Sequence, residues 1–342
     1  MATGGRRDDA ALVEGLGRWV AVRPDQVPTV AGDRASPATI RSIAHADGGQ
    51  ANETVLVDLG PDRSGIVVRL PPLEPTFPDY ELGPQALVQN ALAASGVPAP
   101  APSVVVDDVA WIGAPFLAMP LVRGDIAGPA PAFDDYVTGA DAALQRRMSD
   151  GLLDTTAAVH AVDWRAAGLG AVLPGTTTRD ALERWTAYVD WSSEGDPLPA
   201  LAEALAWCAV RVPPEGEPVL LWGDVRLGNL VFDDARHVRA VLDWDLASIG
   251  PAEMDLAWHL GLEDMMVSLF GLRVEGFPRR DEAVARYEKV SGRTLSNLDW
   301  HEVFALVRAL AINDRHQRIS GDRRRTENPM GAVLLARMAD AT

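Results

Sequence analysis

Three side chains in the segment from Leu220 to Trp258 have the types and the spacing that phosphoryl transfer needs. Asp224 is followed five positions later by Asn229, and Asp243 comes after a further apolar run. A phosphoryl-transfer centre uses one carboxylate to orient the attacking hydroxyl, and an amide oxygen with a second carboxylate to hold Mg²⁺. We therefore predict that Asp224 is the catalytic base and that Asn229 and Asp243 are the Mg²⁺ ligands.

The residues around these three can position them. Two short strand-like runs, 230–232 and 239–242, predict a hairpin that carries Asn229 at one end and Asp243 at the other. Each aspartate taken alone could be an ordinary turn residue. The ordered set, continued by Asp255, favours a phosphoryl-transfer site.

The pattern before residue 120 is mainly that of strands, and the pattern after it is mainly helical. In the first part we predict helices over 8–21 and 85–95 and strands over 53–59, 65–70, 103–106 and 115–119. In the second part we predict helices over 140–161, 178–192, 199–210, 254–270, 280–291 and 298–315. The expected fold class is α+β and bilobal, of the protein-kinase kind. A small β-rich nucleotide-binding lobe would cover 1–119, and a larger, mainly helical catalytic and substrate lobe 120–342.

The charge and composition of the chain limit the classes of partner and the location that we expect. A formal net charge of −17 over 342 residues argues against nucleic acid or an anionic membrane as a partner, and favours a small acceptor with a lean toward a cationic one. No apolar stretch approaches the roughly 18–20 residues that span a bilayer. Cys208 is the only cysteine, so no intrachain disulfide can form. A cytoplasmic location is the expectation.

The motif resembles the aminoglycoside phosphotransferase family, which reads roughly H-G-D-x-x-x-x-N, then I-D-W/F, then D-L-A. More narrowly, the chain resembles the branch related to the kinase-like domain of acyl-CoA dehydrogenase family member 10 and its actinobacterial relatives. Supporting matches are GGQANETVLVDL from Gly48, VVRLPP from Val67, IGAPFLAMPLVRG from Ile112 and AAVHAVDWRAAGL from Ala157. The resemblance covers about residues 40 to 315.

The resemblance implies ATP and Mg²⁺ as cofactors and gives Asp224, Asn229 and Asp243 the roles assigned above. It also implies that Asp255 braces the catalytic loop through hydrogen bonds, and that Gly48 and Gly49 form a turn over the phosphates.

In the same family the hinge meets adenine through its backbone, which here corresponds to Met119, Leu121 and Val122. Pro120 has no N–H, so a hinge donor must come from Leu121 or Val122.

The chain departs from the family pattern at three positions. Trp222 replaces the histidine ahead of Gly-Asp, so that packing or an indole donor must substitute for it. Arg69 stands where the family has a phosphate-binding lysine, since the only lysine is Lys289. The helix glutamate that would pair with that lysine is replaced by Gln85, with Glu81 as the other candidate.

Several neighbouring residues are given structural interpretations. His160 and Trp258 are read as packing residues, and Glu263 and Asp264 as solvent-facing, with an acidic cleft for a cation as the alternative. His259 is left open because its helix should border the substrate cleft.

The predicted function is an ATP- and Mg²⁺-dependent phosphotransferase that acts on a hydroxyl of an unidentified small molecule. Aminoglycosides, macrolides, sugars and hydroxyacyl-CoA compounds all remain open as acceptors. The alternative is a catalytically weak or inactive pseudokinase that binds nucleotide or acts as a scaffold. A hydrolase with Asp224 and Asp243 as paired carboxylates would leave Asn229 unexplained. A protein kinase is disfavoured because about a dozen residues separate Asp243 from Asp255, too few for an activation loop.

Overall fold

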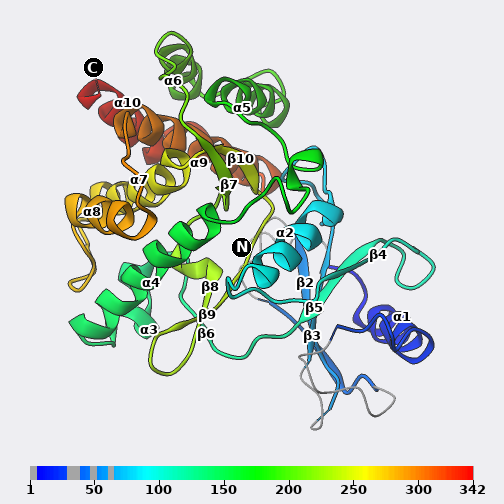
Figure 1. Ribbon diagram of the computed structural model, residues 1–342. Coiled ribbons are helices and arrows are strands. Elements are labelled where there is room, and N and C mark those ends of the chain that lie inside the picture. Colours follow the sequence, from blue (N-terminus) through cyan, green and yellow to red (C-terminus); the bar gives the residue numbers. More distant parts are fainter. Residues whose placement is uncertain (1–5, 29–38, 47–51, 61–64, 342) are drawn as a thin grey trace. The chain divides into compact units, whose positions relative to one another are not determined.

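The structure is a computed structural model that describes residues 6–28, 39–46, 52–60 and 65–341. The chain divides into two compact units, Met1–Arg123 and Gly124–Thr342. The first carries five of the strands and two helices, and the second carries the other five strands and most of the helices (Figure 1). The boundary predicted after residue 119 lies close to this division. The functions assigned to the two lobes remain proposals.

The N-terminal unit is built on a five-stranded antiparallel sheet in the order β1-β2-β3-β5-β4. Residues Val67 and Arg69 of β3 lie opposite Met119 and Leu117 of β5. The strands are β1 (Ser42–His45), β2 (Glu53–Asp58), β3 (Ile66–Leu70), β4 (Val104–Val106) and β5 (Phe116–Pro120), and the helices are α1 (Asp9–Val22) and α2 (Leu82–Ala94).

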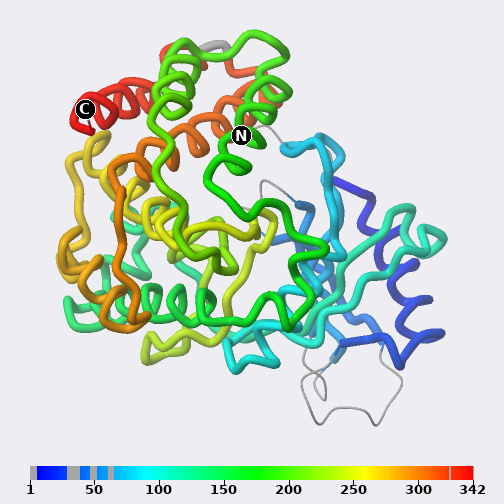
Figure 2. The backbone as a smooth tube through the Cα atoms, turned by 45° about the horizontal axis from the view of Figure 1, so that its top comes forward, coloured from blue at the N-terminus to red at the C-terminus, as the bar shows by residue number. Residues whose placement is uncertain are grey.

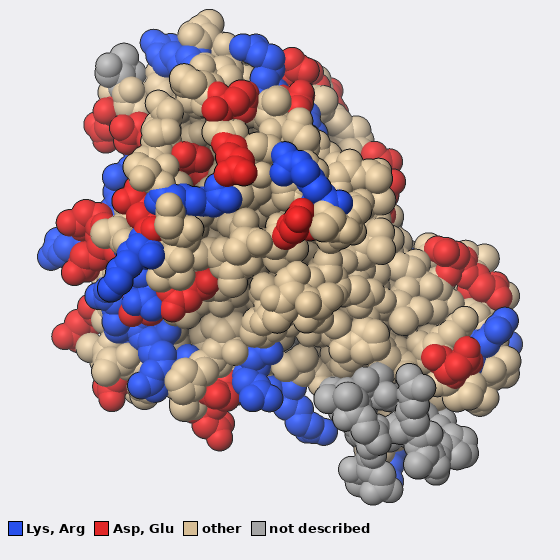
Figure 3. Space-filling model, in the orientation of Figure 1, with Lys and Arg blue, Asp and Glu red and all other residues tan. Residues whose placement is uncertain are grey.

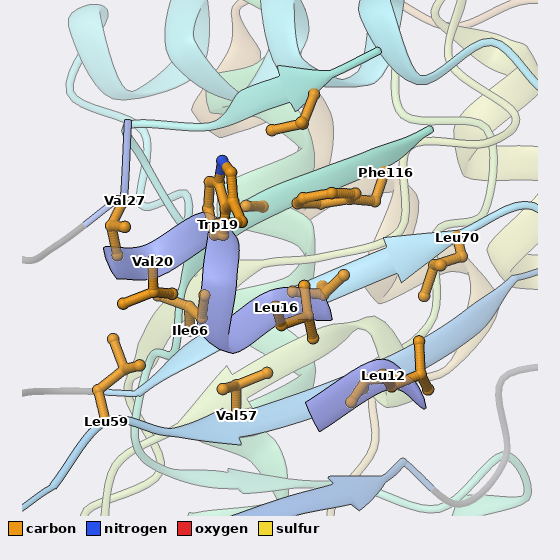
Figure 4. Packing of buried hydrophobic residues seen from close by; sticks show 14 of the residues in the cluster. Leu12, Leu16, Trp19, Val20, Val27, Val57, Leu59, Ile66, Leu70 and Phe116 are labelled. Atoms are coloured by element: carbon orange, nitrogen blue, oxygen red, sulfur yellow. The ribbon is translucent and has the colours of Figure 1, made fainter. Parts of the chain in front are cut away.

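Helix α1 covers one face of this sheet. Its N-cap Asp8 accepts a hydrogen bond from the Ala11 amide, 2.9 Å away. The buried side chains Leu12, Leu16 and Trp19 recur at helical spacing and pack on the sheet (Figure 4). The Trp19 ring meets the Phe116 ring edge-on, with 5.1 Å between centroids.

Helix α2 covers the opposite face, as the alternation along β5 requires. Phe116 and Ala118 belong to the cluster under α1, whereas Leu117 and Met119 pack with Leu82 and Ala86 of α2. In β3, Val67 also belongs to the α2 side, so Arg69, two residues on, faces the same helix. This alternation decides which partner Arg69 meets.

The C-terminal unit is mainly helical, and two of its long helices, α7 and α9, pack against each other. Helix α10 lies beside α6, which comes from much earlier in the chain (Figures 1 and 2). The helices are α3 (Asp135–Thr138), α4 (Ala142–His160), α5 (Thr178–Ser192), α6 (Pro199–Ala209), α7 (Glu253–Phe270), α8 (Arg280–Ser291), α9 (Leu298–Ile319) and α10 (Pro329–Asp340), with short 3₁₀ turns at Pro131–Phe133, Leu169–Ala171, Leu227–Asn229 and Arg323–Glu327. No helix among the described residues is both long enough and apolar enough to span a bilayer.

Two small antiparallel sheets lie among these helices. One pairs β7 with β10, and the other has the order β6-β8-β9. The strands are β6 (Asp125–Ile126), β7 (Pro218–Leu221), β8 (Leu230–Phe232), β9 (Val238–Val241) and β10 (Ser248–Pro251). The predicted hairpin is therefore present as β8 and β9.

Ion pairs link the helices of the C-terminal unit at its surface. Arg286 of α8 reaches Asp150 and Asp154 of α4, at 3.1 and 2.6 Å. Figure 3 shows acidic and basic side chains interleaved over this side of the unit. Two further ion pairs share a buried carboxylate and link three helices. Glu302 of α9, whose side chain is 1% exposed, contacts Arg280 of α8 and Arg337 of α10.

The buried His301 of α9 should make stability depend on pH. His301 is 3% exposed, and this burial lowers its pKa to about 3. Below about pH 6.5 the unfolded chain binds a proton that the folded chain does not, so the free energy of unfolding falls as the pH falls. We expect His301 to account for a loss of about 2 kcal/mol between pH 8 and pH 5.

Urea unfolding at both pH values checks this prediction. His301→Leu should lower the pH dependence by that amount, whereas the matched change at His237, whose side chain is 63% exposed, should not. An equal pH dependence in wild type and His301→Leu would contradict the assignment.

Candidate active site

The catalytic loop runs from the end of β7 to the start of β8 and begins with Trp222-Gly223-Asp224. Gly223 has φ +89°, and a Cβ at this position would lie 2.2 Å from the Leu246 carbonyl oxygen. Both facts require glycine, because an L side chain would be strained in conformation and would clash with backbone. The loop can therefore turn sharply just before the candidate base.

Three donors fix the Asp224 carboxylate. Its Oδ1 accepts a hydrogen bond from the Trp258 indole N–H at 2.9 Å. Its Oδ2 accepts from Arg226 Nε at 2.8 Å and from Asn229 Nδ2 at 2.8 Å. The Asp224 side chain is 16% exposed. Both oxygens are oriented, and part of the group still faces solvent.

Trp258 and Arg226 are site residues that the sequence interpretation missed. Trp258 is buried, as expected of a packing residue, but it is also a donor to Asp224. The available signal is its position three residues after Asp255, since residues i and i+3 share one face of a helix. Helix α7 therefore presents both side chains to the catalytic loop.

The β8–β9 hairpin brings Asn229 and Asp243 together. The Leu242 amide donates to the Asn229 carbonyl at 2.8 Å, directly beyond the Leu230 and Val241 pair of the strand register. Asp243, the next residue, has φ +64°, in the left-handed region that few non-glycine residues adopt and that Asp and Asn adopt most often. This backbone conformation ends the extended run of β9 and turns the chain at the candidate metal ligand.

The donor set fits Mg²⁺. The Asn229 Nδ2 group donates to both the Asp224 carbonyl and its carboxylate, so the amide orientation leaves its oxygen Oδ1 as the atom for a metal. Asp243 adds a carboxylate, and Mg²⁺ prefers such oxygen ligands. The described residues contain no cluster of three or more His, Cys, Asp or Glu that could hold a metal by itself. One or two protein ligands suit a Mg²⁺ ion that also binds substrate phosphates.

Asp255 holds the backbone of the catalytic loop. Its Oδ2 accepts from the Trp222 amide at 2.7 Å, and its Oδ1 accepts from the Gly223 amide at 2.8 Å. His160 Nε2 lies 3.0 Å from the same Oδ2, and both side chains are fully buried. The Nδ1 of His160 pairs with the Tyr287 hydroxyl at 2.6 Å. His160 is thus a packing residue with a polar role, because it connects Asp255 to α8.

Arg308 of α9 contacts the same loop from another side. Its Nη2 donates to the Gly223 carbonyl at 3.0 Å, and its guanidinium lies over the Trp258 and Trp185 rings, 4.6 and 5.1 Å from their centroids. Burial lowers the pKa of Arg308 to about 10. The group remains a cation at neutral pH, and the aromatic faces offset part of its desolvation.

Trp222 takes the place of the family histidine as an indole donor. Its Nε1 donates to the carbonyls of Leu242 at 2.9 Å and of Asp243 at 3.2 Å. Its ring also packs against Trp244. The sequence left two ways in which Trp222 could replace the histidine, by packing or by an indole hydrogen bond, and the structure has both. The hydrogen bond to the Asp243 carbonyl connects the catalytic loop to the candidate metal ligand.

In the N-terminal unit, Arg69 meets Gln85. Arg69 Nη1 donates to Gln85 Oε1 at 3.2 Å, and both residues are buried. Glu81 is exposed and precedes the first residue of α2. Gln85 and Glu81 were the two predicted partners of Arg69, and the structure shows the hydrogen bond to Gln85.

The hinge candidates and the glycine turn lie in the same unit. Met119 is buried in β5 and pairs with Val67. The Leu121 amide donates to the Gly65 carbonyl at 2.9 Å. Because that N–H is already used within the sheet, Val122 becomes the candidate donor to adenine. Gly48 and Gly49 lie outside the described residues.

The sheet-bearing unit, the helical unit and the loop with its hairpin define a kinase-like phosphotransferase fold. The sequence matches the phosphotransferase enzyme family over residues 42–310, and the chain belongs to that family. The resemblance predicted from the motif is confirmed.

Curated relatives support the narrower resemblance. The chain is 31% identical to acyl-CoA dehydrogenase family member 11 of Gallus gallus over 226 residues, which are 65% of this chain and 28% of the relative. It is 28% identical to family member 10 of Mus musculus over 278 residues, which are 78% of this chain and 25% of the relative. The chain thus spans about a quarter of the length of these relatives.

Solved structures show the same fold. A candidate aminoglycoside phosphotransferase from Ralstonia eutropha has a TM-score of 0.73 and 24% identity, with 98% of this chain and 100% of that chain covered. A thermostable mutant of aminoglycoside phosphotransferase APH(4)-Ia, in a ternary complex with ADP and hygromycin B, has a TM-score of 0.55 and 13% identity, with 88% and 94% covered.

Proposed function

We propose that this protein transfers the γ-phosphoryl group of ATP, with Mg²⁺, to a hydroxyl group of a small molecule. The observation that carries the proposal is the Asp224 carboxylate, held through both oxygens by Trp258, Arg226 and Asn229. A base fixed in this way can orient an attacking hydroxyl without reorganisation during the reaction.

The other residues take complementary roles in this proposal. Asn229 and Asp243 hold Mg²⁺, which when bound neutralises charge on the phosphates. Arg69 contacts the phosphates while Gln85 orients it, and its planar fork provides two parallel donors. The hinge at Met119 to Val122 meets the base of the nucleotide. A neighbour solved with ADP supports nucleotide binding. We place the protein in the cytoplasm.

The second candidate is a pseudokinase, and two departures from the family pattern favour it. Arg69 stands where the family has a phosphate-binding lysine, and the helix residue that meets it is Gln85 instead of a glutamate. Such a changed phosphate contact could leave nucleotide binding in place with slow or no turnover. The intact Asp224, Asn229 and Asp243 favour the enzyme.

Thermal unfolding with Mg²⁺ and ATP tests the first step of the proposal. At about 100 times the dissociation constant, bound nucleotide should raise the free energy of unfolding by ~2.7 kcal/mol. Asp243→Ala should abolish the part of this stabilisation that depends on Mg²⁺. The exposed Asp234→Ala, in the turn of the same hairpin, should retain it.

The same samples separate the two candidates. ADP release with a panel of hydroxyl acceptors supports the enzyme, whereas stabilisation without ADP release from any acceptor supports the pseudokinase. No stabilisation of the wild type would reject the enzyme and a nucleotide-binding pseudokinase, and would leave only a scaffold role.

A further inference from the structure

A pocket of about 80 Å³ lies in the C-terminal unit between the catalytic loop and helix α7. One water needs roughly 10–15 Å³ of such space, so the pocket can hold several heavy atoms. Its wall is mostly apolar and includes Val225, Leu227, Leu262, Met266, Val267 and Phe277.

The pocket adjoins one of the three donors that fix the candidate base. Arg226, which donates to Asp224 Oδ2, is part of its wall. His259, also in the wall, directly follows Trp258 in the sequence, and Trp258 donates to Oδ1. A molecule in this pocket therefore lies beside Arg226, which helps to position Asp224.

One polar atom in the wall is without a hydrogen bond. His259 Nε2 is buried and has no hydrogen-bond partner in the described part of the chain. Glu263 lies one helical turn away, with 3.9 Å between His259 Nε2 and Glu263 Oε1. Burial raises the pKa of Glu263. A hydroxyl or similar oxygen of a ligand could bridge these two side chains by accepting from one and donating to the other.

The pocket offers a cationic occupant little to offset its desolvation. The two arginines of the wall, Arg226 and Arg273, are each paired with an aspartate, Asp224 at 2.8 Å and Asp264 at 3.5 Å. The acidic group of the wall itself is Glu263, and burial raises its pKa. An ammonium group would lose its hydration among mostly apolar side chains.

Apolar surface continues beside the pocket. Phe133 and Phe270 are 55% and 52% exposed, and their rings meet edge-on with 5.1 Å between centroids. Phe133 follows Ala132, and Phe270 stands two residues before Leu272, both of which line the pocket. A longer apolar ligand could extend over these rings.

We propose that this pocket binds the body of the acceptor, and that the acceptor class is an uncharged, largely aliphatic or aromatic hydroxyl compound. A second polar group of the acceptor would hydrogen-bond with His259 and Glu263. This inference rests on the proposed function, since it assigns the acceptor site of the same reaction.

A set of matched six-carbon probes tests the class. Hexane-1,6-diol is neutral, 6-aminohexan-1-ol carries an ammonium group and 6-hydroxyhexanoate carries a carboxylate, so only the charge of one end differs. We expect the diol to bind the nucleotide-free protein most tightly by NMR titration, and to give at least tenfold higher kcat/KM in ADP release than the amine. Equal or tighter binding of the amine or the carboxylate would overturn the proposal. Each methylene added in a series of diols from four to seven carbons should improve affinity by roughly fourfold while it is buried.

A charge placed in the wall provides the matched variant. Met266→Glu should weaken diol binding at least tenfold, and Ser268→Glu, exposed on the same helix and outside the pocket, should change it less than twofold. Met266→Gln gives a neutral second variant, which should weaken binding less than Met266→Glu, and circular dichroism checks that each variant is folded.

The outcomes distinguish the proposed acceptor pocket from the proposed phosphotransferase activity. Diol binding without ADP release keeps the pocket and rejects the phosphotransferase. ADP release from the diol that is unchanged in both Met266 variants keeps the phosphotransferase and rejects the pocket.

Discussion

Asp224→Asn is expected to lower kcat for phosphoryl transfer by about 10²–10⁴-fold, the range that a positioned general base contributes. The substitution removes the negative charge and keeps the shape of the side chain. Nucleotide binding should survive, because the proposed metal ligands and the phosphate contact are other residues. The stability should fall slightly as well, because either orientation of the new amide places its NH₂ group against the N–H of Trp258, Arg226 or Asn229.

ADP release measures the loss of activity, and the Mg²⁺-ATP-dependent shift in unfolding temperature measures the binding that should remain. Asp234→Asn is the matched control, since it makes the same chemical change at an exposed position ten residues later in the sequence. A reduction smaller than tenfold in a folded, nucleotide-binding variant would remove Asp224 from the role of base.

Asp255→Ala is expected to lower the free energy of unfolding by about 3–5 kcal/mol, as in other buried charged networks that lose one partner. The change leaves the amides of Trp222 and Gly223 and the ring of His160 without their acceptor, in a fully buried place. Because the same amides hold the catalytic loop, activity should fall together with stability.

Chemical denaturation of purified wild type and variant measures the effect. Asp264→Ala is the comparison on the same helix: its pair with Arg273 is long and half-exposed, so we expect a loss below about 1 kcal/mol. A comparably small loss for Asp255→Ala would show that the loop does not depend on this carboxylate.

Most of the long elements were predictable from the sequence, whereas several of the short ones were not. Helices α4, α5, α7 and α8 match their predicted ranges within a few residues, because each repeats an apolar face over several turns. Strands β1, β6, β7 and β10 and helix α3 have two to four residues, too few to show a period. Helix α10 was also missed, although Asn328 caps it and Pro329 begins it.

The site was predictable as far as its chemistry is local in sequence. The interval from Asp224 to Asn229 and the hairpin to Asp243 are set within 20 residues. The spacing of Trp258 from Asp255 predicts that the two share a helix face, but its bond to Asp224 depends on how α7 packs. The contact of Arg308 with the catalytic loop depends on the packing of α9, and no spacing rule specifies it. The alternation of β3 does predict that Arg69 faces α2, but the choice of Gln85 over Glu81 needed the end of that helix to be located.

Within the catalytic loop, Asp255 accepts hydrogen bonds only from the main-chain amides of residues 222 and 223. The side chain of residue 222 is therefore free to change without loss of the brace, as the tryptophan in this chain illustrates, whereas residue 223 must remain glycine. A motif search that demands histidine before Gly-Asp would overlook chains of this kind. A search pattern anchored on the glycine and on the distant aspartate would find them.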